Sequence, residues 1–206
     1  MSPSAYSIPL SKAPSPIDRR FQQGGWLLLA SLVMFFLSSV LLYGFYAYWR
    51  RDDPLSLVPL PMDYLFSTVM LFATSGTLHL ATLAIRREKR VRTVFWIIVS
   101  LVLAIGFTGM QLTATNEMLS GPALAEGNGK GLAGMVAVLV FLHALHVAGG
   151  IIALAIVLVR TLRRKYDHEC YWPIRFAAQY WHFLDLVWIV MLISFWSTTG
   201  GFVIGH

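Results

Sequence analysis

The chain has 206 residues, of which 57% are hydrophobic and only 13% are charged, and its formal net charge is +6. Soluble domains usually contain about 45–50% apolar and about 25% charged residues. Because one globule of this size has no room to bury such an excess of apolar side chains, lipid must surround much of the chain. The composition therefore excludes a soluble enzyme, a nucleic-acid-binding domain and a disordered protein.

Five long apolar stretches lie between clusters of charged residues. Each is longer than the roughly 20 residues that an α-helix needs to cross the hydrocarbon core of a bilayer. Lipid offers no partners to unpaired backbone groups, and no stretch alternates in polarity as a membrane-spanning strand does. The sequence thus predicts an all-α integral membrane protein with five transmembrane helices, over residues 24–49, 64–85, 94–119, 132–159 and 176–204.

The segments outside the helices add little chemistry. Residues 1–23 are rich in proline and serine and are predicted to form a mobile tail, whereas residues 24–206 form one membrane domain. Cys170 is the only cysteine, which excludes an internal disulfide and a cysteine-based zinc or iron–sulfur site. We interpret it as a free thiol without a role.

The orientation follows from the positions of lysine and arginine, which concentrate on the cytoplasmic side of membrane proteins. With the N-terminus inside, 13 of the 16 basic residues fall in the tail and in the second and fourth loops, all on the inner side. The predicted N-terminus is therefore cytoplasmic and the C-terminus lies on the outer side. The positive charge is explained by topology and by anionic lipid headgroups, without nucleic acid as a partner.

Five ionisable side chains interrupt the apolar stretches, namely His79, His143, His146, His182 and Asp185. A charge at mid-membrane costs about 2.5–3.5 kcal/mol on an insertion scale, so each group is expected to have a partner or a function. The pairs in the fourth and fifth helices are each spaced by three and share a helix face. We expect His143, His146, His182 and Asp185 to form a polar cluster along a seam that also involves the second helix.

The residues alone leave three interpretations of these groups open. They are a packed bundle with hydrogen-bonded histidines, a haem or metal site, or a proton or ion path. Two haem ligands on facing helices are a known arrangement. A di-iron site is disfavoured, since the only other histidines are His168 in a loop and His206 at the end. Small residues at positions 144–153 favour close helix packing.

Two segments resemble signatures of a known family. Residues 180–188, YWHFLDLVW, resemble the Trp-His-Phe-(Val/Leu)-Asp-x-Val-Trp signature of subunit III of haem–copper oxidases. Residues 143–150, HALHVAGG, are similar to that family's His-Gly-x-His-Val-x-x-Gly, and residues 67–79 and 106–111 match more weakly. The family positions outside the polar cluster are His79, Gln111, Gly149, Gly150, Tyr180, Trp181 and Trp188. Leu32 and Ala114 stand where the family often has acidic residues.

The resemblance implies an accessory, non-catalytic and cofactor-free subunit of a respiratory terminal oxidase, in the short five-helix bacterial form. Haem and copper are then expected in subunits I and II. This chain would pack on subunit I in the bacterial cytoplasmic membrane, bind phospholipids, and support proton uptake and stability during O₂ reduction. Arg86, Arg87 and Arg175 are candidates for contacts with lipid headgroups.

Alternatives follow from the same residues. The family also serves quinol oxidases, and a related protein accompanies some nitric oxide reductases; the preference for cytochrome c oxidase rests on frequency alone. A stand-alone membrane haem protein would use the buried histidines as axial ligands. A proton-coupled carrier is a third class, although the sequence lacks inverted repeats and helices broken at mid-depth.

Overall fold

A computed structural model describes residues 16–51, 60–120, 130–163, 172–199 and 202–203. This part of the chain contains five long α-helices: α1 (Pro16–Trp49), α2 (Asp63–Arg86), α3 (Arg90–Ser120), α5 (Lys130–Leu162) and α6 (Trp172–Thr198). All five are long and apolar enough to cross a membrane. The prediction of an all-α bundle with five spans is confirmed.

The helices extend beyond the apolar stretches that predicted them. The first begins at Pro16 rather than at residue 24, so the expected tail is helical in its last part, while residues 1–15 lie outside the described residues. Proline is tolerated there because the first N–H groups of a helix have no partner within it. A hydropathy pattern detects only the part of a helix that lies in hydrocarbon, and charged helix ends that reach the headgroups are missed.

The fifth predicted helix is too long at its C-terminal end. It ends at Thr198 rather than at residue 204, and β2 (Phe202–Val203) follows. Two glycines come directly after Thr199, and glycine lowers helix stability by about 1 kcal/mol relative to alanine. The two residues of β2 pair in parallel with β1 (Leu60–Pro61), a strand pair that the sequence did not predict.

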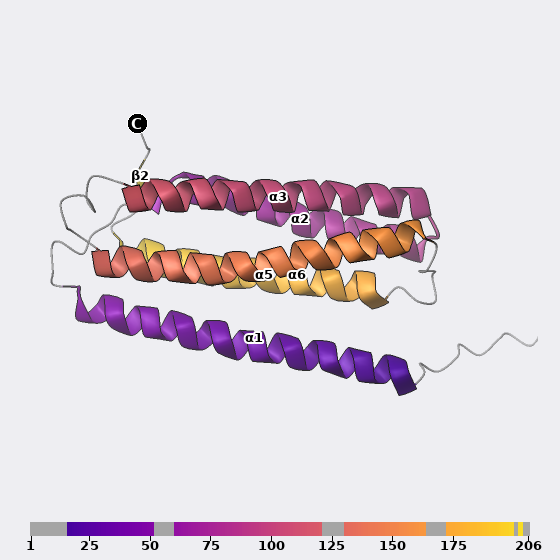
Figure 1. The fold of residues 1–206 in the computed structure, drawn as a ribbon, viewed down its shortest axis with the longest axis horizontal. Helices are drawn as coiled ribbons and strands as arrows, with labels where there is room; N and C mark the ends of the chain where they lie inside the picture. The colour runs from indigo at the N-terminus through magenta and orange to yellow at the C-terminus, as the bar shows by residue number, and fades with distance from the viewer. Residues whose placement is uncertain (1–15, 52–59, 121–129, 164–171, 200–201, 204–206) are drawn as a thin grey trace, which may run out of the picture.

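Successive helices run in opposite directions, so α1, α3 and α6 run one way and α2 and α5 the other (Figure 1). Three residues join α2 to α3 in a tight turn, in which Glu88 has a positive φ of 58°. At the same end of the bundle, the Arg90 guanidinium donates hydrogen bonds to the carbonyl oxygens of Thr161 and Leu162. These carbonyls belong to the last turn of α5, where they have no partner within the helix. The turn thus joins α2 to α3, and the first residue of α3 caps α5.

Burial differs strongly between the helices. The most apolar part of α6 is half buried, and its Trp181, Trp188 and Phe195 are among the largest fully buried side chains of the core. By contrast, α1 lies along α5 and α6 at the edge of the bundle and exposes most of its apolar side chains (Figure 1). A Cβ at Gly25 would lie 2.6 Å from the Phe176 ring, so α1 approaches α6 closely near the N-terminal ends of both helices. The centre of the bundle is α6, and the site is built around it.

Candidate functional site at the α2–α6 seam

The polar groups of α6 pair with α2. Ser75 donates its hydroxyl hydrogen to Oδ2 of Asp185, and its Oγ lies 2.9 Å from Nδ1 of His182. The carboxylate and the imidazole are themselves 3.9 Å apart. Since the single hydroxyl hydrogen goes to the carboxylate, Oγ accepts from a hydrogen on Nδ1. The order of donation therefore runs from His182 through Ser75 to Asp185.

The environments of these side chains differ. Ser75 is 5% and Asp185 6% exposed, whereas half of the His182 side chain is exposed. Oδ1 of Asp185 is buried and has no protein partner among the described residues. A buried carboxylate at membrane depth is stabilised only if it is hydrogen-bonded, and Ser75 supplies that bond from the neighbouring helix.

A second link joins the same helices closer to the N-terminal end of α2 and the C-terminal end of α6. The Trp188 indole N–H donates to Oγ1 of Thr68 at 2.9 Å, and Thr68 donates in turn to the Tyr64 carbonyl oxygen. The Tyr64 hydroxyl lies 3.0 Å from Oγ1 of Thr115 on α3. Because Thr115 donates its own hydrogen to the Gln111 carbonyl oxygen, Tyr64 is the donor between α2 and α3. These bonds connect α2, α3 and α6 in one network.

His143 and His146 do not join this network. His143 is fully buried among the rings of Phe36, Phe107 and Trp188, with centroid distances of 6.2, 6.2 and 5.5 Å. Neither of its ring nitrogens has a protein partner in the described part of the chain. His146 donates from Nδ1 to the Leu142 carbonyl oxygen of its own helix, at 2.7 Å.

The expected cluster of four residues is therefore divided in the structure. His182 and Asp185 come together with Ser75, which the sequence analysis missed as a partner. His146 faces α1 instead, where its ring lies 4.9 Å from that of Phe36. A signal for Ser75 existed, since it lies within the segment 67–79 that matches the family weakly, but helix spacing cannot tell which neighbouring helix faces it.

The family glycines have different roles. A Cβ on Gly150 would lie 3.1 Å from the Tyr180 ring and 3.2 Å from that of Trp181, so this position sets the distance between α5 and α6. A Cβ on Gly149 would meet nothing within 4 Å. The Tyr180 hydroxyl donates to the His146 carbonyl oxygen at 2.9 Å and ties the two helices at the same level. Close packing was expected of the small residues, and here Gly150 provides it.

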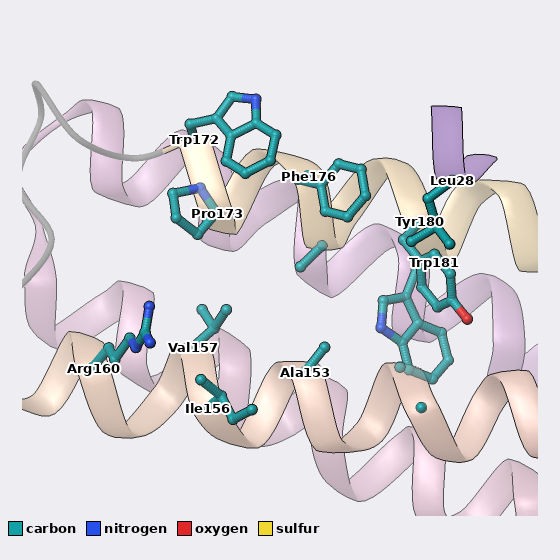
Figure 2. A pocket seen from close by; sticks show the side chains of 13 residues that line it. Leu28, Ala153, Ile156, Val157, Arg160, Trp172, Pro173, Phe176, Tyr180 and Trp181 are labelled. Atoms are coloured by element: carbon teal, nitrogen blue, oxygen red, sulfur yellow. The ribbon is translucent and has the colours of Figure 1, made fainter. Parts of the chain in front are cut away.

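An apolar groove of about 380 Å³ lies beside this contact (Figure 2). It is formed by the second half of α5, the first half of α6 and Leu28 of α1. Ala153 and Val157 line one side, Phe176 lines the other, and Arg160 lies at one end. The volume is within the range of about 300–1,000 Å³ seen for ligand pockets. A groove with apolar walls and a terminal cation matches the chemistry of an acyl chain with an anionic headgroup.

The remaining predicted positions are placed as follows. Gln111 is buried on α3, and its side-chain amide has no protein partner within the described residues. His79 is exposed on α2, one turn from Ser75. The three candidates for contacts with lipid headgroups are exposed at one end of the bundle; they are Arg86, Arg87 and Arg175. Arg160, which was not among the candidates, is exposed at the same end.

The side chains around these histidines do not suit a haem. The rings that surround His143 occupy the space that a porphyrin on that residue would need, and His146 packs against Phe35 and Phe36. In the described ranges, no three His, Cys, Asp or Glu side chains gather in a way that would hold a metal ion. Cys170, His168 and His206 lie outside those ranges.

Five apolar spans, a polar link between α2 and α6 and a close glycine contact between α5 and α6 define a multi-pass all-α membrane protein. The family model for cytochrome c oxidase subunit III matches residues 15–199. The chain belongs to this family, as its two signature segments indicated.

Individual relatives come from oxidases of two kinds. The chain is 29% identical to cytochrome c oxidase subunit 3 of Tetraodon nigroviridis, over 87% of this chain and 70% of that protein. It is 25% identical to cytochrome bo(3) ubiquinol oxidase subunit 3 of Pseudomonas aeruginosa, over 81% and 79%. It is 28% identical to a probable quinol oxidase subunit 3 of Staphylococcus aureus, over 67% of each chain.

Proposed function

We propose that this chain is an accessory subunit of a respiratory haem–copper oxidase, which holds no redox centre itself and packs against the subunits that carry haem and copper. The observation that carries the proposal is the family match over residues 15–199, which includes all five spans. Aromatic rings pack around His143 and His146, and His182 bonds to Ser75, which supports a role in packing for these side chains. The chain's contribution to O₂ reduction is then structural, through support of the catalytic subunits and their proton supply.

The partners in this proposal are subunits I and II, in a bacterial cytoplasmic membrane. The exposed apolar surface of the helices supports a neighbour in the membrane, because large side chains face outward along α1, α2 and α6. Most of the described basic residues lie at the end of the bundle where α1 begins, which supports a cytoplasmic N-terminus. Both kinds of electron donor, cytochrome c and quinol, remain within the proposal, since relatives from both kinds of oxidase match the chain.

Phospholipid is the second proposed partner. The groove beside Gly150 fits an acyl chain, and the Arg160 guanidinium at its end fits the phosphate of the same lipid. Aromatic side chains at the entrance, Trp172 and Phe176, stack on each other with ring centroids 5.1 Å apart. Tryptophan is common at this depth of a bilayer, where one edge of the ring is apolar and the other is wet.

The proposal is tested by purification from native membranes through an affinity tag on this chain. We expect the mild-detergent eluate to contain haem- and copper-bearing subunits and to consume O₂ with a suitable donor. A matched purification with the tag on an unrelated five-span protein is the control for detergent micelles that trap neighbours. Recovery of this chain without any haem protein would contradict the proposal.

A further inference from the structure

A polar stripe runs along the outer edge of the α2–α6 seam. On α2 it consists of Arg86, His79 and Ser75, at spacings of seven and four residues that place them on one helix face. On α6 it consists of Arg175, His182 and Asp185, and the first two are again seven apart. Because the helices are antiparallel and meet at Ser75 and His182, both rows run from the inner end of the bundle toward its middle.

The two imidazoles lie well inside the membrane. At 1.5 Å per residue, His79 is about 10 Å from Arg86 along α2, and His182 is about 10 Å from Arg175 along α6. Arginine and lysine reach the headgroups from such depths with long flexible stems, but the imidazole is held on a single methylene. Both histidines therefore face the hydrocarbon layer wherever lipid covers this edge.

Exposure makes that placement unfavourable in a lone chain. His79 is exposed and half of the His182 side chain is exposed, and acyl chains provide no hydrogen bonds. Nδ1 of His182 is already used, since it donates to Ser75. In the neutral ring, Nε2 on the far side is then a hydrogen-bond acceptor, and no described residue of this chain donates to it.

We propose that a transmembrane helix of a neighbouring subunit docks along this edge and supplies hydrogen-bonding side chains to His182 and His79, with a donor opposite Nε2 of His182. Serine, threonine, asparagine or tryptophan on that helix would provide such a donor. The inference rests on the proposed function and deepens it, because it assigns one face of the chain to contact with the rest of the oxidase.

The test uses substitutions that distinguish the two ring nitrogens of histidine, Nδ1 and Nε2. The asparagine amide reproduces the position of Nδ1 and keeps the bond to Ser75, whereas the glutamine amide reproduces the position of Nε2. The double variant His79→Asn with His182→Asn should reduce retention of this chain on the affinity-purified oxidase by about tenfold, since two intramembrane hydrogen bonds contribute roughly threefold each. The double variant with glutamine at both positions should retain it.

Separate measurements test whether the variants fold. Both double variants should give a monodisperse isolated chain, and the thermal unfolding of the asparagine variant should be close to that of the wild type. If the two variants are retained equally, the inference is overturned while the proposed function stands. If even the wild-type chain fails to bring down haem proteins, the proposed function fails instead.

A photo-cross-linking amino acid identifies the occupant directly. Placed at Phe72, which is exposed on α2 one turn from Ser75, it should cross-link to another subunit of the tagged oxidase. Placed at Val102, which is exposed on α3, it serves as the matched control. Cross-links from position 72 only to lipid, or to a second copy of this chain, would overturn the inference.

Discussion

Ser75 on α2 and Asp185 on α6 are 110 residues apart in the chain, yet the serine hydroxyl donates directly to the aspartate carboxylate. Both side chains are almost fully buried inside apolar spans. Ser75 thus donates the only protein hydrogen bond that the described structure gives to this carboxylate. It also fixes the level at which the two helices meet.

Removal of this donor should destabilise the bundle. Ser75→Ala leaves the Asp185 carboxylate and the His182 Nδ1 without their common partner, and an unsatisfied buried group costs about 1–3 kcal/mol, more when it is charged. Asp185→Asn should also weaken the link, because a neutral amide is a poorer acceptor than a carboxylate. The measurement is the free energy of unfolding of the purified chain in detergent.

A matched control for this change is Ser38→Ala, since Ser38 is exposed and, among the described residues, its hydroxyl bonds only to the Met34 carbonyl oxygen of its own helix. That variant should change the unfolding free energy by less than about 0.5 kcal/mol. Equal effects of the two alanine substitutions would contradict the importance of the bond between the helices.

Trp188→Phe should also destabilise the α2–α6 contact. The indole is fully buried, donates to Thr68 and packs against the rings of Tyr64, Phe107 and His143. Phenylalanine keeps most of the ring contacts but loses the bond and some volume, so we expect a loss of about 1–3 kcal/mol. Trp196→Phe on the same helix is the control, because that side chain is 56% exposed; a similar loss there would show that the effect is not specific.

Gly150 should tolerate no branched side chain. Valine at this position would push atoms into the Tyr180 and Trp181 rings, which already lie 3.1–3.2 Å from the position of a Cβ, and overpacking costs about 1–3 kcal/mol. Gly149→Val is the adjacent control, since nothing lies within 4 Å of its Cβ position. We expect a lower melting temperature for the Gly150 variant alone, measured by thermal unfolding in detergent.

Much of the fold could be predicted from the sequence, because the strongest constraint on it is lipid. The five spans follow from hydropathy, and His182 and Asp185 stood out since ionisable groups are rare in such spans. Which polar side chains of different helices meet could not be predicted, because spacing along one helix does not show which neighbouring helix its residues face. The sequence therefore grouped His143 with His182, although in the structure Ser75 faces His182 and aromatic rings enclose His143.

The short strand pair could not be predicted from the sequence either. Two residues on each side carry no period that distinguishes them from a loop, and the pairing joins positions 60 and 202, which are distant in the sequence. The groove was missed for a related reason. Its walls come from α1, α5 and α6, and apolar positions that face lipid and those that face a groove look alike in a sequence.

Bound phospholipid should depend on that groove. Ala153→Trp fills the space between α5 and α6, and Arg160→Gln removes the cation at its end, so both variants should lose lipid that survives purification. Native mass spectrometry counts the lipids that remain. Arg163→Gln is the control, because Arg163 is exposed on the same side and does not line the groove; loss of lipid in this variant as well would point to general attraction of headgroups.

The orientation can be tested with the chain's own cysteine. Cys170 lies between α5 and α6, on the side predicted to be cytoplasmic, so a membrane-impermeant maleimide should label it in inverted vesicles but not in intact spheroplasts. A variant with Cys170→Ser and Ser120→Cys moves the thiol to the C-terminal end of α3, on the side predicted to be outside, and should reverse the pattern. Labelling of Cys170 from the outside would contradict the cytoplasmic N-terminus.

The central claim is that this chain supports a haem–copper oxidase without a redox centre of its own. Its most direct test is the haem and metal content of the full chain expressed and purified without the other oxidase subunits, by absorption spectroscopy and elemental analysis. The account predicts a colourless protein with far less than one equivalent of haem, iron or copper. A stoichiometric haem band, lost when His143 or His182 is replaced, would contradict it.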